Sequence, residues 1–365
     1  MSTKALHLLL TPKERFEPEA AGAFALNVLE TSRVSRFRDH ITVFGSSVEN
    51  PFEGIRFQPL AKAHWWEGDR NKAMARRYLE FARDHRPALV EVYNRPVMID
   101  VLRRELHDVP LALHFGNDPR RMDGSRSVAE RRNLLEQGTA VICVSDFIRR
   151  CFIDGIDQPL SARAHVVHTG VQRAAEFPAK ENRIAYVGRV VREKGVLELV
   201  RALACVLPRH PHWSAEIIGA RWFGIGEKRT AYENSVARAA APCNRIVLSG
   251  FRAHEEVLAS LDLAAIAVVP SLWDDPFPRT ALEALAHGCA LICSTRGGLP
   301  ELGSDRAIFL DTISVDSLAN TLDRLIANNE ERHWLQRRGW KEFPFDIQRA
   351  TSALDDLRER FTSRL

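Results

Sequence analysis

The chain has 365 residues, a length that predicts two domains at about 150 residues each. Its 45% apolar and 27% charged residues exclude a disordered, fibrous or disulfide-stapled small protein. The net charge of +4 is far from the basic balance of a dedicated nucleic-acid binder, so we expect no nucleic-acid partner, whereas anionic small molecules or an acidic membrane surface are compatible with it.

The first predicted element is an apolar stretch at residues 5–10, which the polar run 11–15 ends. No small-residue cleavage site follows it, so the pattern favours a buried strand over a secretory signal. The six cysteines are scattered, and no apolar run approaches the roughly 18 residues of a membrane span. These features predict a cytoplasmic protein with reduced thiols.

The first half continues with alternating apolar and amphipathic runs, the pattern of a parallel sheet with helices on both faces. Its further strand-like runs are residues 41–44, 88–93, 111–114, 140–145 and 164–168. Its helix-like runs are residues 20–33, 71–85, 97–106, 128–137 and 146–153.

The second half repeats this alternation after the polar segment 172–182, which marks a natural domain boundary. Its strand-like runs are residues 183–188, 214–219, 245–249, 263–269, 291–294 and 307–310. Its helix-like runs are residues 196–207, 228–240, 255–260, 280–287, 315–328, 331–338 and 347–361. We therefore predict the α/β class, with doubly wound domains at residues 1–172 and 173–346.

Ligands of doubly wound sheets lie beyond the carboxyl ends of the strands, so the turns that follow strands are the candidate sites. A phosphate-binding P-loop and a serine-hydrolase elbow are missing from the sequence, and Gly224 and Gly226 lack a third glycine because Arg229 stands in its place. Cys289 and Cys293 do not have the spacing of zinc ligands, so no metal site is expected.

The first candidate turn runs from Tyr186 to Gly195, between a strand and a helix, and Gly188 lets the backbone turn after the strand. Arg189 and Lys194 place a guanidinium and an ammonium ahead of the helix N-terminus, an arrangement suited to a diphosphate. The alternative interpretation is that both are solvated surface cations.

The second candidate turn follows the run 263–269 and carries Asp275 in the loop. Glu283 lies eight residues later, about one turn into a helix whose small and apolar neighbours predict burial. A buried acid needs a partner, which ribose hydroxyls would provide. The alternative is that Glu283 caps a helix or pairs within the protein.

The third candidate turn covers residues 296–301, after the run 291–294. Gly297 and Gly298 permit a close approach of the backbone to a ligand. Glu301 and the backbone amides of this turn are candidate contacts for sugar hydroxyls or phosphate. Three such turns after consecutive strands favour one shared ligand site.

These motifs resemble those of retaining glycosyltransferases of family four, which have the two-domain GT-B fold. The resemblance rests on G-R…E-K-G at 188–195, P-S…D-P-F…E-A…G at 270–288 and G-G-L-P-E at 297–301. It implies two Rossmann-like domains that face each other across a cleft. In that arrangement the C-terminal domain binds the donor, and the helix at 347–365 completes the N-terminal, acceptor-binding domain.

By position, the resemblance assigns the donor diphosphate to Arg189 and Lys194 and the donor ribose to Glu283. Asp275 stands where the family has a longer glutamate that faces the donor sugar, and Pro278 replaces a glycine and lacks its N–H donor. The other donor-binding positions that the resemblance implies are Gly22, Phe277, Gly297, Gly298, Leu299 and Glu301.

The resemblance is looser in the first half, where His114 matches a strand-end histidine near the transferred sugar and Asp118 is a second candidate. The implied catalytic groups are His114, Arg189, Lys194 and Asp275, with no metal or other cofactor. They would transfer a sugar, with retention of configuration, from a UDP- or GDP-linked donor to a glycan or glycolipid. A nucleotide-sugar epimerase of the same fold and a non-catalytic nucleotide-sugar binder are the alternatives.

Trp65 and Trp66 precede the basic helical run 71–86. This pairing suits an anionic membrane surface or an anionic glycolipid. The acids Glu67, Asp69, Glu80 and Asp84 dilute the charge, however, and favour a solvated basic helix beside a partly buried tryptophan. The stretch E-V-Y-N-R-P at 91–96 is similar to bacterial envelope-polysaccharide enzymes. We therefore expect lipopolysaccharide core or exopolysaccharide assembly at the inner face of the cytoplasmic membrane.

Overall fold

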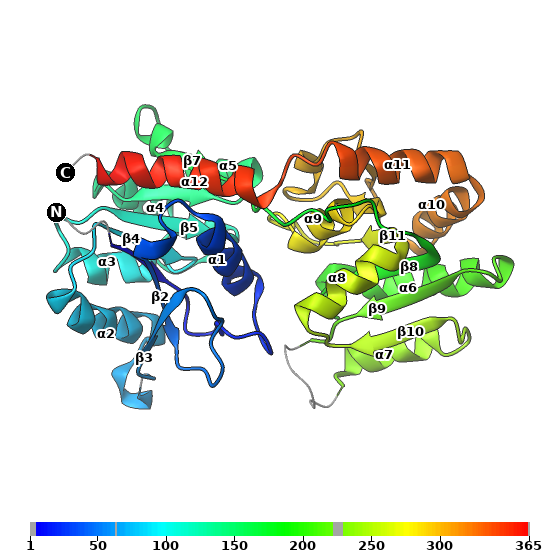
Figure 1. The fold of residues 1–365 in the computed structure, drawn as a ribbon, viewed down its shortest axis with the longest axis horizontal. Helices are drawn as coiled ribbons and strands as arrows, with labels where there is room; N and C mark the ends of the chain where they lie inside the picture. The colour runs from blue at the N-terminus through cyan, green and yellow to red at the C-terminus, as the bar shows by residue number, and fades with distance from the viewer. Residues whose placement is uncertain (1–4, 63, 222–228, 364–365) are drawn as a thin grey trace. The chain divides into compact units, whose positions relative to one another are not determined.

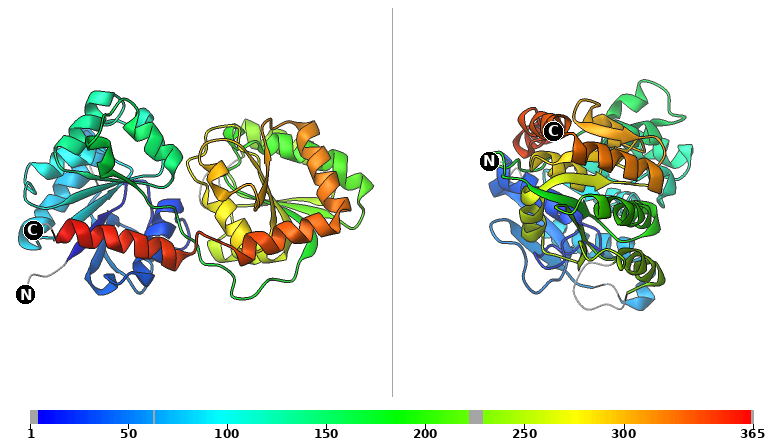
Figure 2. Two further views of the ribbon diagram at one scale, coloured as in Figure 1. Left: turned by 90° about the horizontal axis from the view of Figure 1, so that it is seen from above. Right: turned by 90° about the vertical axis from the view of Figure 1, so that its right-hand side faces the viewer.

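The computed structural model describes residues 5–62, 64–221 and 229–363. The chain forms two compact units, one of residues 1–170 with 347–365 and the other of residues 171–346 (Figure 1). In each unit helices pack around one parallel sheet (Figure 2), which confirms the predicted α/β class. None of the described helices has the length and apolar composition to cross a membrane.

The N-terminal unit is built on a sheet in which every described strand pair is parallel. The chain winds outward from β1 on one side and from β4 on the other, so these two strands flank the switch point of the sheet. In spatial order the strands are β3 (Arg56–Leu60), β2 (Ile41–Ser46), β1 (Leu6–Leu9), β4 (Leu89–Tyr93), β5 (Leu111–Phe115), β6 (Ala140–Cys143) and β7 (Ala164–Val166).

Strand β3 is not predicted by the sequence pattern. Its five residues, R-F-Q-P-L, mix exposed, partly buried and buried positions and include Pro59. The strand lies at the edge of the sheet, where proline is tolerated because one side of the backbone needs no partner.

Two apolar clusters cover the two faces of the N-terminal sheet. Along β1 the faces alternate, since Leu9 belongs to one cluster and Leu8 to the other. The Leu9 face packs on α2 (Arg70–Asp84), α3 (Val97–Arg103), α4 (Val128–Glu136) and α5 (Asp146–Ile153). The Leu8 face packs on α1 (Ala23–Val34) and α12 (Ile347–Thr362), so the end of the chain completes this unit.

The C-terminal unit has the same plan, with the switch point between β8 and β11. Its described strands, in spatial order, are β10 (Ile246–Gly250), β9 (Ser214–Ile218), β8 (Glu181–Val187), β11 (Ala264–Val269), β12 (Ala290–Ser294) and β13 (Ala307–Leu310). Its helices are α6 (Val196–Val206), α7 (Ala231–Ala240), α8 (His254–Leu263), α9 (Arg279–Ala286), α10 (Val315–Ala327) and α11 (Asn329–Lys341).

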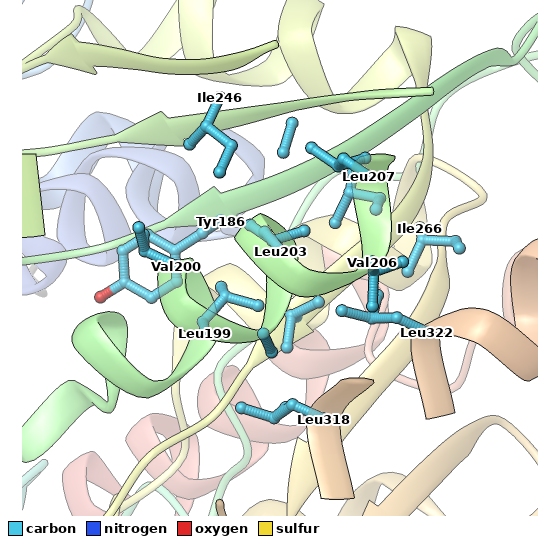
Figure 3. Close-up of a cluster of buried hydrophobic side chains, with 14 of the residues drawn as sticks. Tyr186, Leu199, Val200, Leu203, Val206, Leu207, Ile246, Ile266, Leu318 and Leu322 are labelled. Atoms are coloured by element: carbon cyan, nitrogen blue, oxygen red, sulfur yellow. The ribbon is translucent and has the colours of Figure 1, made fainter. Parts of the chain in front are cut away.

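The core of the C-terminal unit centres on α6. Its Leu199, Leu203 and Val206 pack between the sheet and α10, where Leu318 and Leu322 meet them (Figure 3). Burial of such leucine side chains contributes about 1.5–3 kcal/mol each, so this cluster holds the β8–α6 connection in place. That connection carries Arg189 and Lys194.

The element boundaries differ slightly from the expected ones. Leu263 ends α8, and the strand expected from residue 263 begins at Ala264. The C-terminal unit starts at Val171 because its backbone N–H donates to Phe345 O at 3.0 Å and it bridges Asp346. Gly224 and Gly226 lie outside the described residues.

Candidate active site

The three turns that the sequence singles out meet at the carboxyl ends of neighbouring strands. Strands β8, β11 and β12 are adjacent in the sheet, so the loops that follow them share one edge. The backbone N–H of Leu272 donates to Glu193 O at 2.8 Å, and that of Gly298 donates to Asp275 O at 2.8 Å. The second turn is therefore bonded to both of the others.

The first turn places Lys194 against the acid of the second. Lys194 ends the short helix η5 (Arg192–Lys194), and its Nζ lies 2.5 Å from Asp275 Oδ2. Ser271 Oγ donates to the same oxygen at 3.0 Å, and the ammonium lies 5.6 Å from the centre of the Trp273 ring. The Asp275 side chain is 5% exposed and that of Lys194 18%, so the pair is largely shielded from water.

Gly195 allows the backbone of the first turn to pack directly against that of the second. Its φ of 68° lies in the left-handed region that favours glycine, and a Cβ atom there would collide with the carbonyl oxygen of Pro270. Gly195 is also the N-cap of α6, so Lys194 lies directly before the positive end of that helix.

Arg189 lies in the same β8–α6 connection, and its side chain is exposed. Within the described part of the chain its guanidinium forms no ion pair, and its backbone carbonyl accepts a hydrogen bond from the Tyr186 hydroxyl at 2.8 Å. The two cations of the first turn thus differ, because Lys194 is held by an acid whereas Arg189 faces solvent.

Glu283 is buried on α9 and paired within the protein. Its Oε1 accepts from Arg279 Nε at 2.6 Å and lies 2.7 Å from His254 Nε2. Burial raises the pKa of Glu283, but the charge of Arg279 and the hydrogen bond from His254 outweigh it, so the pKa lies below its usual range. Both contacts are made to Oε1, so Glu283 is paired within the protein, which is the alternative interpretation of the sequence. Neither contact uses Oε2, which leaves that oxygen for a ligand.

The third turn is explained by packing more than by a ligand. Gly297 has a φ of 63°, and a Cβ atom on it would collide with the backbone of Asp275. The amides of Gly298, Leu299 and Glu301 donate to Asp275 O, Arg296 O and Gly298 O, so they are already used inside the protein. The close approach expected toward a ligand is therefore made to the Asp275 backbone.

Three other expected donor contacts occupy structural places. Leu299 is fully buried, and Phe277 is buried with its ring 5.2 Å from that of Phe345. Pro278 is the N-cap of α9 and offers no N–H. Phe277 and Pro278 belong to the loop before α9, the helix that carries Glu283.

In the N-terminal unit, His114 lies near the end of β5 and its side chain is 9% exposed. Its ring stacks on Tyr93 with centroids 4.3 Å apart, and its Nε2 lies 3.2 Å from Glu91 Oε2. Asp118 instead caps η3 (Pro119–Arg121) by accepting from Arg120 N at 3.0 Å, and its carboxylate also pairs with the Arg120 side chain.

Gly22 is the N-cap of α1, and the carboxylate of Glu14 covers it. Glu14 Oε2 accepts from Ala25 N at 3.3 Å, so an internal carboxylate stands at this helix N-terminus. Burial raises the pKa of Glu14 above its usual range. The glycine expected to approach a donor therefore contacts a side chain of its own unit.

The C-terminal unit is similar to a known protein family. Residues 171–342 match the family model described as Glycosyl transferases group 1. The C-terminal unit is a group 1 glycosyltransferase domain. The three turns, with Lys194, Asp275 and Glu283, all lie inside it.

Curated relatives of this group 1 domain protein cover different shares of the chain. Spore coat protein SA of Bacillus subtilis (strain 168) is 26% identical over 296 residues, covering 74% of this chain and 78% of that protein. The lipopolysaccharide 1,2-N-acetylglucosaminetransferase of Salmonella typhimurium is 25% identical over 154 residues, covering 41% of this chain and 40% of that protein.

Solved structures share the fold of both units. The structure of Anabaena Alr3699/HepE in complex with UDP and glucose has a TM-score of 0.75 at 16% identity, covering 96% of this chain and 98% of its own. WaaG, a glycosyltransferase involved in lipopolysaccharide biosynthesis, has a TM-score of 0.71 at 14% identity, covering 96% and 99%. The two parallel-sheet units thus match the domains of GT-B glycosyltransferase structures, the class that the motifs imply.

Sequence reasoning missed several residues that hold the site groups. His254 contacts Glu283 across 29 residues of chain, and Glu91 contacts His114 from the neighbouring strand. The available signal is the charged residue inside the apolar strand L-V-E-V-Y, since a buried acid requires partners. Ser271 belongs to the P-S…D-P-F motif, but the sequence does not indicate its contact with Asp275, and nothing in the sequence indicates Glu14.

Proposed function

We propose that the chain is a retaining glycosyltransferase that moves a sugar from a nucleoside diphosphate sugar to a glycan or glycolipid acceptor. The observation that carries this proposal is the Lys194–Asp275 ion pair at the positive end of α6, with Glu283 on the buried helix α9, in a group 1 domain. The relative named for lipopolysaccharide N-acetylglucosamine transfer and the neighbour that holds UDP and glucose support it. Envelope-polysaccharide or lipopolysaccharide synthesis in the cytoplasm is the proposed setting.

The proposed mechanism follows from where charge develops. The bond between the donor sugar and the diphosphate breaks, and the leaving phosphate oxygen gains negative charge while the sugar becomes oxocarbenium-like. Lys194, Arg189 and the N-terminus of α6 supply positive charge at that end, so the proposal needs no metal or other cofactor. The acceptor hydroxyl attacks on the same face, and its proton passes to the leaving phosphate, which retains the anomeric configuration.

Asp275 has two functions in this proposal. Its carboxylate holds Lys194 in one place, and the ammonium keeps further N–H groups for a phosphate because it has three donors. Its negative charge also lies where positive charge develops on the donor sugar. Glu283 Oε2 accepts from the ribose hydroxyls, while His254 and Arg279 hold the other oxygen.

A thermal-shift measurement with UDP, GDP and inorganic pyrophosphate tests the donor site, since a ligand of the folded state raises the melting temperature according to its affinity. We expect a nucleoside diphosphate to stabilise the wild type. Glu283→Gln should weaken that binding by about 10- to 100-fold because a charged hydrogen bond to ribose is lost.

Pyrophosphate is the internal control, since it lacks ribose and its binding should be unchanged in Glu283→Gln. An equal loss for pyrophosphate and nucleotide would mean that Glu283 only supports the fold. A wild type that neither nucleotide nor any UDP- or GDP-sugar stabilises would contradict the proposed function.

The acceptor side of the proposal concerns an exposed aromatic and basic surface. Trp65 is 88% and Trp66 64% exposed, on η2 (Trp65–Glu67) directly before α2, so the partly buried tryptophan of the alternative interpretation is not found. Arg70, Lys72 and Arg76 are exposed on the adjoining helix. We propose that this surface meets anionic headgroups at the inner face of the cytoplasmic membrane, near a glycolipid acceptor.

Sedimentation with vesicles of phosphatidylglycerol and phosphatidylcholine checks this surface. We expect the double change Trp65→Ala and Trp66→Ala to weaken binding to anionic vesicles by at least about tenfold, because two apolar rings no longer leave water. Trp334→Ala is the matched control, since Trp334 is 55% exposed in the other unit. Equal binding by both variants would exclude the tryptophans as membrane contacts.

A further inference from the structure

A carboxylate is completely buried in the central sheet of the N-terminal unit. Glu91 stands in the middle of β4, a strand whose five residues are all buried, and is itself 0% exposed. A charge in this position is strongly unfavourable unless it is paired and hydrogen-bonded. The groups that surround Glu91 must therefore stabilise its charge.

Two donors hold the Glu91 carboxylate. Arg358 of α12 donates from Nε to Oε1 at 2.7 Å and from Nη2 to Oε2 at 3.0 Å, a two-pronged contact. The hydroxyl of Tyr93 donates to Oε2 at 3.0 Å. Arg358 also donates to Asp355 Oδ1 at 3.0 Å, and Ser35 Oγ donates to that same oxygen at 2.8 Å.

His114, on the neighbouring strand β5, lies beside this network. It is the register partner of Tyr93 on β5 and stacks on that ring at an interplanar angle of 13°. Its Nε2 lies 3.2 Å from Glu91 Oε2, slightly out of line for an ideal hydrogen bond, and has no other polar partner among the described residues. The Glu91 carboxylate therefore lies between the Arg358 guanidinium and the imidazole of His114.

We propose that Glu91, held by Arg358 and Tyr93, is a positioning residue that fixes the proton of His114 on Nε2 and leaves Nδ1 as a hydrogen-bond acceptor for a sugar hydroxyl. The inference rests on the proposed function, since the hydroxyl belongs to the sugar of the proposed reaction. It assigns α12, the last helix of the chain, a part in preparing a site group on β5. Asp355 contacts Arg358 but not His114, so it belongs to the supporting layer alone.

Nitrogen-15 NMR of protein labelled in the histidine rings tests the proton position directly. His114→Ala identifies the signal among the 13 histidines. At pH 8 we expect the wild type to carry its ring proton on Nε2 and the Glu91→Gln variant, in which an NH₂ replaces one carboxylate oxygen, to carry it on Nδ1. A wild-type proton on Nδ1, or identical spectra for the two proteins, would overturn the proposal.

A double-mutant cycle tests the link to turnover. Release of UDP from UDP-glucose, or of GDP from GDP-mannose, is measured for Glu91→Gln, His114→Ala and the double variant. We expect Glu91→Gln to lower kcat about tenfold in the wild-type background and to have no further effect when His114 is absent, because coupled residues are not additive. Multiplicative losses would show a purely structural role.

Asp355→Asn is the matched control, because it makes the same carboxylate-to-amide change in the same network without touching His114. Its turnover should stay within about twofold of the wild type. A loss equal to that of Glu91→Gln would overturn the proposal in favour of general destabilisation. A wild type that hydrolyses neither donor contradicts the proposed function, whereas the NMR spectra still decide where the His114 proton lies.

Discussion

Replacing Lys194 with alanine is expected to lower the turnover of a nucleoside diphosphate sugar by about 100- to 1,000-fold, the effect of removing one donor aimed at developing charge. The ammonium lies 2.5 Å from Asp275 Oδ2 and directly before the positive end of α6, so it is fixed before the diphosphate arrives. The measurement is the steady-state release of UDP from UDP-glucose or of GDP from GDP-mannose.

The control for this substitution is Arg192→Ala in the same short helix. Arg192 is exposed and its guanidinium lies 5.9 Å from the centre of the Tyr232 ring, away from Asp275. Its turnover should change by less than about threefold, as for other exposed charges. Because Lys194→Ala also leaves a buried carboxylate without its cation, melting temperatures are measured beside turnover. The double change Lys194→Ala and Asp275→Asn should regain stability but not turnover. Normal kinetics in Lys194→Ala would refute the diphosphate assignment.

Replacing Arg358 with alanine is expected to destabilise the N-terminal unit by about 3–5 kcal/mol, the cost of leaving a buried charge without its partner. Glu91 loses both guanidinium contacts, and Asp355 loses one. Hydrogen exchange followed by mass spectrometry reports the two units separately. Peptides from β4 and β5 should exchange faster, while those from β8 and β11 should not change.

The pH dependence of this loss distinguishes charge from packing. Burial raises the pKa of Glu91, but in the wild type the charge of Arg358 and the contacts of the carboxylate with His114 and Arg358 hold this pKa well below its usual range. The wild type therefore keeps this stabilisation above about pH 4.3 and loses it only as the pH falls further. Without Arg358, burial makes folding favour the protonated acid, so the difference between the two proteins should shrink toward pH 4.

Arg131→Ala is the matched control for Arg358→Ala. Arg131 is 2% exposed in the same unit, but its guanidinium donates to backbone carbonyls, including Phe152 O at 2.7 Å and Asp154 O at 2.8 Å. Carbonyls do not titrate, so its loss of stability should be independent of pH over this range. The same pH dependence in both variants would mean that Glu91 is not the group responsible.

The parts of the site that the sequence predicts are those that follow from local patterns. Apolar runs locate the buried strands, and parallel strands bring the turns after β8, β11 and β12 to one edge of the sheet. The sequence can therefore predict that Lys194 and Asp275 lie close together. The short strand β3, with its mixture of polar and apolar residues, cannot be predicted in this way, because its neighbours in the sheet decide its conformation.

Pairings across the chain lie beyond such patterns. His254 reaches Glu283 over 29 residues, and Arg358 reaches Glu91 over 267, distances at which spacing carries no information. Gly297 illustrates a second limit. Its presence predicts a close approach, but the sequence does not say that the approaching group is the backbone of Asp275.

The return of α12 to the first unit has a consequence for biosynthesis. Domains usually fold as they leave the ribosome, N-terminal ones first. Here the sheet of residues 1–170 emerges with Glu91 lacking its counter-ion until residue 358 has been translated, after the whole second unit. The nascent N-terminal unit thus stays incomplete until α12 has been synthesised. Fusions or truncations that displace α12 will therefore impair the folding of the N-terminal unit, although they change the C-terminal end of the sequence.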